Sequence, residues 1–257
     1  MSDIRCEKNG DIATVTLSNP GKLNALDVAM WQGLRSTFDA LSADTALRCI
    51  IVCGEDGNFA AGADISEFAT VRSNMADGMR YHTETIAQAL HAISTCLHPT
   101  IAAIEGVCVG GGLEIACACD IRIASPASRF GIPINRLGFP LAPGELQGLL
   151  ELVGKATALE ILLEGRVFDA AEAQAKGLLH RLADDVPEEA RLSAQRIAKG
   201  APLAARMNKK LIHRLSVAAQ PLSEQELAEA FAFLESQDYR EGVSSFLQKT
   251  PPQFTGQ

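Results

Sequence analysis

Aromatic residues are scarce in this chain of 257 residues: they make up 5% of it, with one tryptophan and two tyrosines. Small aliphatic side chains must therefore fill most of any core. No apolar run approaches the roughly 18 residues that a membrane-spanning helix needs. The amino terminus lacks the basic and then apolar pattern of a signal peptide, and a strand-like pattern follows too soon for a transit peptide. We expect a soluble cytoplasmic protein with no membrane partner.

Clusters of basic residues are also missing. The net charge is −8, and no Lys/Arg run suggests a nucleic-acid partner. An anionic ligand stays possible, because a few local cations or helix N-termini can hold one. The seven cysteines are an odd number, and most lie in apolar runs such as residues 49–53. Buried free thiols in a reducing compartment explain them best, and their spacing predicts no metal site.

The first half of the chain alternates strand-like runs with helical patterns. Asp27 is placed to cap a helix with apolar residues at helical spacing, and a further helix is predicted to start near Leu113. The predicted strands are residues 12–17, 49–53, 100–105 and 121–124, and the first long amphipathic helix covers 76–97. From Gly144 onward the pattern predicts helices only, at 144–153, 156–164, 170–176, 188–199, 203–217 and 223–248. The chain is thus an α/β protein, with a core over residues 1–199 and a helical region over 200–257.

Two glycine-rich segments follow predicted strands. Residues 106–114 read GVCVGGGLE and open a helix, so the unpaired N–H groups of its first turn are accessible at residues without side chains. Glu114 falls in that first turn, beside N–H groups that favour negative charge. Residues 59–65 read FAAGADI and have the same character. Taken alone, each segment is better interpreted as a structural turn.

Taken together with the rest of the chain, these segments resemble the crotonase superfamily, the enoyl-CoA hydratase/isomerase family. The matching stretches, in order, are NALD, FAAGADISEF, HPTIAAIEG, VGGGLEIACACDIRIAS, FGIP, GKATALEILLEGRVFDAAEAQAKGLL and FLQKTPPQF. The resemblance implies a crotonase-like spiral of ββα units. It also implies that the C-terminal helices, residues 200–257, drive assembly into a homotrimer or a homohexamer.

Apolar residues on several faces of that C-terminal region agree with an assembly role, because a helix pair of this kind needs a second surface to bury against. The residues are Leu211, Leu215, Leu227, Phe231, Phe233 and Leu234.

The resemblance further implies that the substrate is an acyl-CoA thioester, so that coenzyme A arrives with the substrate and no cofactor is bound permanently. By position, the backbone amides of Ala61 and Gly111 form the oxyanion hole that stabilises an enolate. Such preorganised donors are worth roughly 3–4 kcal/mol each. The residues implied to line the CoA channel are Ala25, Leu26, Gly62, Ala63, Asp64 and Ile65.

The chain departs from the family at one catalytic position. Family hydratases place two glutamates around a water molecule; one matches Glu114, whereas the other position holds Ile134. Glu145 is the nearest carboxylate that could replace the missing one. Arg136 stands where hydratases have an apolar residue and could pair with Glu145 or Glu114.

Other polar residues lie on the predicted helix that borders the acyl pocket in relatives. They are Tyr81, His82 and Glu84, and we interpret them as the solvated surface of that helix.

Four functions remain open. The first is an enoyl-CoA hydratase with Glu114 as acid/base. The second is an enoyl-CoA isomerase, in which one carboxylate carries a proton from C2 to C4. The third is another reaction through the same enolate: decarboxylation, hydrolysis or carbon–carbon cleavage. The fourth is an acyl-CoA binder without activity, against which the retained Glu114 argues.

Overall fold

A computed structural model describes residues 1–216 and 223–253 of the chain. Its larger sheet has the order β1-β2-β3-β4-β6-β9, and only β1 and β2 pair antiparallel within it. The strands of this sheet are β1 (Asp3–Asn9), β2 (Ile12–Ser18), β3 (Cys49–Gly54), β4 (Thr100–Ile104), β6 (Ile121–Ala124) and β9 (Arg181–Leu182). A smaller sheet joins β5 (Val107–Val109), β7 (Arg129–Gly131) and β8 (Phe168–Asp169).

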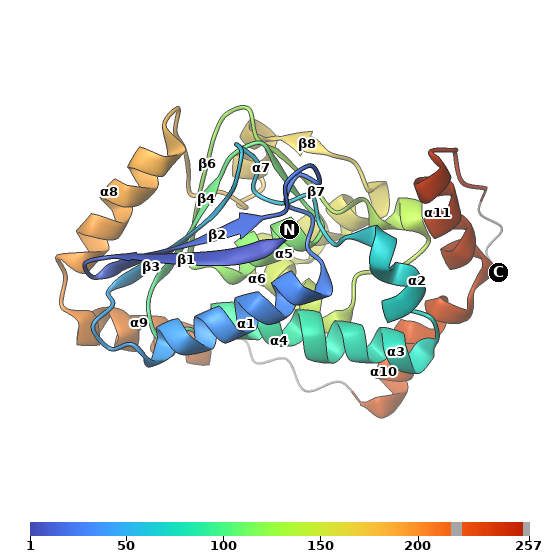
Figure 1. The fold of residues 1–257 in the computed structure, drawn as a ribbon, viewed down its shortest axis with the longest axis horizontal. Helices are drawn as coiled ribbons and strands as arrows, with labels where there is room; N and C mark the ends of the chain where they lie inside the picture. Colours follow the sequence, from blue (N-terminus) through green and yellow to red (C-terminus); the bar gives the residue numbers. More distant parts are fainter. Residues whose placement is uncertain (217–222, 254–257) are drawn as a thin grey trace.

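Helices surround the larger sheet (Figure 1). The first half contributes α1 (Val28–Ala43), η1 (Ile65–Glu67), α2 (Phe68–Val71), α3 (Met75–Arg80), η2 (Tyr81–Ile86), α4 (Ala87–Ser94) and α5 (Gly111–Ala118). The second half contributes η3 (Pro133–Leu137), α6 (Pro143–Glu164), α7 (Ala170–Ala175), α8 (Val186–Ala198), α9 (Pro202–Leu215), α10 (Glu224–Phe231), η4 (Ala232–Glu235) and α11 (Gln237–Gln248). Among the described residues, no helix has the length and apolar character needed to cross a membrane.

The predicted α/β fold is confirmed. The capping residue predicted for the first helix also has its predicted role. The Asp27 side chain accepts from the Met30 amide and so begins α1. Buried side chains on one face of the sheet pack against α8, and those on the other face join the main core with α1 and α4. The long helix predicted over residues 76–97 is instead α3, a π-helical turn and α4.

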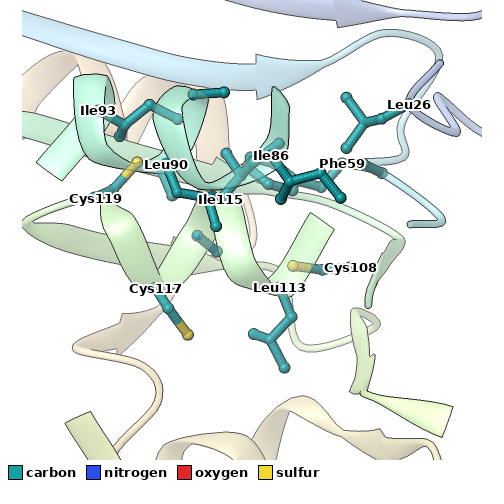
Figure 2. Packing of buried hydrophobic residues seen from close by; sticks show 14 of the residues in the cluster. Leu26, Phe59, Ile86, Leu90, Ile93, Cys108, Leu113, Ile115, Cys117 and Cys119 are labelled. Carbon is teal, nitrogen blue, oxygen red and sulfur yellow. The ribbon is translucent and has the colours of Figure 1, made fainter. Parts of the chain in front are cut away.

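Helix α5 lies inside the main core. Leu113 and Ile115 belong to the same cluster as Ile86 and Leu90, as Figure 2 shows. The start of α5 approaches the chain at Ala60 so closely that a methyl group on Gly112 would lie 2.3 Å from the Ala60 carbonyl oxygen. Glycine at this position is therefore what lets the helix begin where it does.

The C-terminal segment folds back onto its own chain. A methyl group on Gly78 of α3 would meet Leu234 at 2.2 Å, and one on Gly242 of α11 would meet the backbone of Leu137 at 2.3 Å. Phe231 and Leu234 are consequently buried without a second subunit, which corrects the expectation that they await one. Leu211 stays largely exposed. The Leu215 side chain and residue 217, the predicted end of that helix, lie outside the described part.

Candidate active site

The FAAGADI segment runs between the NALD segment and β5. The Leu26 amide donates to the Gly62 carbonyl at 2.7 Å, and the Asp64 amide donates to the Leu26 carbonyl at 2.8 Å. On the other side, Ala60 forms a parallel bridge with Cys108 of β5. The structure thus brings the residues predicted for the CoA channel together: Ala25 precedes the bridged Leu26, and Ile65 follows Asp64, whose amide bonds to Leu26.

The assignment of Ala61 to the oxyanion hole is wrong in this structure, because its amide already donates to the Leu23 carbonyl at 2.9 Å. Ala63 has the better orientation. It forms a parallel bridge with Leu26, and the central residue of such a bridge directs its own N–H away from the partner strand. That direction leads to the start of α5: a methyl group on the adjacent Gly62 would lie 3.6 Å from the Gly111 nitrogen.

Gly111 begins α5, where the first amides have no carbonyl partner within the helix. Gly110 precedes it with φ of 50°, a conformation that favours glycine, and its carbonyl accepts from the Glu114 amide at 3.0 Å. Glu114 therefore lies one turn into α5, and its side chain is buried. Predicting Ala63 from sequence would have required the φ of 96° at Gly62, which turns the chain between residues 61 and 63.

A second carboxylate lies near Glu114. Glu145, in the first turn of α6, is buried and contacts the buried His82, with 2.5 Å between Glu145 Oε1 and His82 Nδ1. His82 lies in the π-helical turn η2, and such turns are frequent at functional sites. The interpretation of Tyr81 and His82 as solvated surface is wrong, since both are buried; only Glu84 is exposed.

Burial and neighbouring charges set the ionisation of this cluster. Burial raises the pKa of Glu114 well above its ordinary value; the charge of Glu145 raises it further, and Arg72 opposes the rise. Burial lowers the pKa of His82 against the opposing influence of Glu145. The raised pKa favours the neutral form of Glu114, and the lowered pKa favours the neutral form of His82, whose Nδ1 contacts Glu145.

Arg72, which follows α2, is the buried cation of this cluster. Arg136, expected to pair with Glu145 or Glu114, is exposed, and among the described residues it forms no ion pair with either. Ile134 is buried, so an apolar side chain occupies the position of the family's second glutamate. Nothing in the sequence distinguished Arg72 from a surface residue at the end of a short helix.

Glu114 and Glu145 line one cavity of about 1240 Å³. Leu90 of α4, Cys117 of α5 and Gly148 of α6 contribute to its wall. The amides of Ala63 and Gly111 are groups that can stabilise an oxyanion, and the two buried carboxyl groups are groups that can move protons.

Comparisons with known proteins identify the family of the chain. The family model described as enoyl-CoA hydratase/isomerase matches residues 7–257, and the chain belongs to this family of enzymes. A probable enoyl-CoA hydratase of Mycobacterium bovis is 37% identical over 98% of this chain and 97% of its own length. The prediction of a crotonase-family α/β fold is confirmed.

Two solved structures illustrate the likeness. An enoyl-CoA hydratase/carnithine racemase from Magnetospirillum magneticum is 45% identical, with a TM-score of 0.82 over 100% of this chain and 97% of that one. A methylmalonyl-CoA decarboxylase in complex with 2-nitronate-propionyl-CoA is 26% identical, with a TM-score of 0.89 over 99% and 98%.

Proposed function

We propose that this protein hydrates 2-enoyl-CoA thioesters, with Glu145 in place of the glutamate that Ile134 removes. The observation that carries the proposal is that two buried carboxyl groups, those of Glu114 and Glu145, line one cavity. Burial and the charge of Glu145 raise the pKa of Glu114. Opposed protonation states are what an acid and a base in one site require. The hydratase named among the relatives supports the same reaction.

In the proposed reaction, the amides of Ala63 and Gly111 bind the thioester oxygen. Glu145 takes a proton from water as the water oxygen bonds to C3, and the electrons of the double bond move toward the thioester oxygen to form the enolate. Neutral Glu114 then gives its proton to C2 and becomes ionised. Proton transfer from Glu145 to Glu114 restores the starting state, so no atom or charge is left over.

Coenzyme A enters as part of the substrate, and we propose that it lies along residues 62–65. Asp64 is held there by Lys22 at 2.5 Å and accepts from the Ser66 amide at 3.1 Å. Partial burial raises the pKa of Asp64, but these bonds outweigh it and lower the pKa overall. A fixed carboxylate keeps the local backbone ready to contact the nucleotide.

We also propose a cytoplasmic homotrimer or homohexamer, with residues 200–257 as the assembly region. All seven cysteines are free, which suits a reducing compartment. Helix α9 exposes large apolar side chains that a neighbouring subunit would cover. They are Leu203, Met207, Leu211 and Ile212.

The test is crotonyl-CoA hydration by the parent and by Glu145→Gln. Loss of the base should lower kcat by roughly 10²–10⁴. Glu164→Gln is the matched control, because Glu164 lies on the same helix, is exposed, pairs with Arg166 and does not line the cavity. Efficient hydration that Glu145→Gln leaves unchanged would reject the role of Glu145. A double-bond shift without gain of water would instead identify an isomerase.

A further inference from the structure

We propose that Arg72 binds a second, free carboxylate on the acyl group, so that the preferred substrates are dicarboxylic acyl-CoA thioesters. This inference rests on the proposed function for the identity of the thioester class. It assigns to Arg72 a role in substrate specificity that neither Glu114 nor Glu145 has.

Arg72 is a buried cation, and some of its N–H donors form no hydrogen bond. Its residue is 5% exposed, and Nε and Nη1 have no hydrogen-bond partner in the structure. No ion pair joins it to a carboxylate among the described residues. Removing a guanidinium from water costs several kcal/mol unless its N–H groups are satisfied. An anion that arrives with the substrate would satisfy them.

Aromatic rings fix the plane of the guanidinium. Its Cζ lies 3.8 Å from the centroid of the Phe68 ring and 4.4 Å from that of Phe139, with Tyr81 at 5.4 Å. Tyr239 of α11 packs edge-on against Phe139, with ring centroids 6.0 Å apart, and the nearby Arg72 opposes the rise that burial causes in the Tyr239 pKa. Because stacking occupies its faces, the guanidinium can offer only its N–H edge, which is the edge that binds a carboxylate through two parallel hydrogen bonds.

The rings of His82 and Tyr81 connect Glu145 to Arg72. His82 contacts Glu145, its ring centroid lies 5.3 Å from that of Tyr81, and the Tyr81 centroid lies 5.4 Å from the Cζ of Arg72. The charge of Arg72 acts on both Glu114 and His82, lowering the pKa of each. Among the described residues, no ion pair joins Arg72 to Glu114, and Arg72 Nε and Nη1 have no hydrogen-bond partner. Glu145 is already engaged with His82 at 2.5 Å. The carboxylate that completes this cluster must then come from the ligand.

A different role is conceivable on the same geometry: Arg72 could serve only to ease the ionisation of Glu114 during turnover. The two roles separate in binding experiments on saturated thioesters, which cannot be hydrated or isomerised. Electrostatic assistance to Glu114 confers no preference between saturated ligands, whereas a carboxylate receptor does.

The experiment is isothermal titration of the full chain with matched pairs of equal carbon number: succinyl-CoA and butanoyl-CoA, glutaryl-CoA and pentanoyl-CoA, adipyl-CoA and hexanoyl-CoA. At one or more lengths the dicarboxylic member should bind about 10- to 100-fold more tightly, the range that charged hydrogen bonds of about 1.5–3 kcal/mol provide. Arg72→Met should abolish the preference, and Arg72→Lys should keep part of it.

Arg80→Met is the matched control, because Arg80 is exposed, pairs with Asp77 and lies on the neighbouring helix α3. It should leave the preference intact. Should Arg72→Met fail to fold, Arg72→Lys decides, and it should weaken the preference. Equal affinities at every length, or a preference that survives these changes, would overturn the inference. Crotonyl-CoA hydration is measured separately, so failure of the proposed reaction leaves this result readable on its own.

Discussion

Two clusters of buried charge flank helix α5. The cluster at its start contains Glu114 with Glu145, His82 and Arg72; the cluster after its end contains Asp120 and Arg122. Arg122 is buried, as are the members of the first cluster, whereas Asp120 is partly exposed. The two clusters differ in how completely each satisfies its own polar atoms.

The cluster after α5 is saturated by the protein. Arg122 Nε donates to the Leu178 carbonyl at 2.8 Å, and Nη1 donates to the Cys119 carbonyl at 2.5 Å. Asp120 Oδ2 accepts from the Thr100 amide at 2.7 Å and from Lys209 at 2.8 Å. Such a network fixes the end of α5, and Asp120 and Arg122 hold these bonds although they line the same cavity as Glu114 and Glu145.

The cluster at the start of α5 is left incomplete. Arg72 Nε and Nη1 and His82 Nε2 have no partner in the structure, and burial alone already shifts the pKa of Glu114 upward. Unsatisfied buried groups and displaced pKa values cost stability, so a protein keeps them where a ligand or a reaction needs them. The difference between the clusters therefore separates structural charge from functional charge.

The largest expected effect is on turnover. Glu114→Gln should lower kcat for crotonyl-CoA hydration by roughly 10²–10⁴, because the amide cannot give a proton to C2. Asp120→Asn changes the same type of group at the other end of α5 and should leave kcat of the folded enzyme within a few fold. Steady-state kinetics with both variants measures this difference. Equal losses of kcat would show that the two clusters do not differ in their catalytic role.

The next effect is on the free energy of unfolding. Here we expect the larger loss from a change in the cluster after α5 and the smaller loss from a change in the cluster at its start. Arg122→Met should cost about 3–5 kcal/mol of unfolding free energy, because the backbone carbonyls of Ala116, Cys119, Asp120 and Leu178 lose their charged donor. Arg72→Met should change it by less than about 1 kcal/mol, since it removes a buried charge without an ion-pair partner. Urea unfolding followed by fluorescence of the buried Trp31 measures both. A larger loss for Arg72→Met would mean that Arg72 is structural.

Sequence patterns predicted the architecture well where local rules dominate. The alternation over residues 12–17, the cap at Asp27 and the apolar run at 49–53 all correspond to elements of the structure. The first strand and the very short strands were missed, because β1 is mostly exposed and β8 and β9 have two residues each. β8 and β9 exist through pairing with segments far away in the sequence, and β1 through a hairpin with β2; periodicity does not register such pairing.

The candidate site was predicted in part. Glu114 followed from its place one turn after the glycines, and Glu145 was named as the nearest replacement for the missing glutamate. The oxyanion donor was misplaced by two residues, because only backbone geometry shows that the Ala61 amide is already bonded to Leu23. His82 and Arg72 could not be predicted as site residues, since their burial depends on the C-terminal segment that supplies Phe231 and Tyr239.

The unfolding free energy as a function of pH tests the neutral state of Glu114 most directly. A folded-state pKa raised above the unfolded value of about 4.3 means that stability is fully present below that value and falls as pH rises, by up to about 1.4 kcal/mol per pH unit, until the raised pKa is passed. Asp120 has the opposite sign, because its pKa is lowered by His213 and Lys209 despite burial; its contribution is lost as the solution becomes acidic. His82, whose pKa is lowered, also acts in the direction opposite to Glu114.

The difference between the parent and Glu114→Gln isolates the glutamate from these other groups. We expect the variant to gain stability over the parent steadily as pH rises above about 4.5, while Asp120→Asn differs from the parent mainly by removing the loss at acidic pH. Parallel curves for the parent and Glu114→Gln from pH 4 to 8 would show that Glu114 is ionised in the folded protein. That result would contradict the assignment of Glu114 as the neutral acid beside an ionised Glu145.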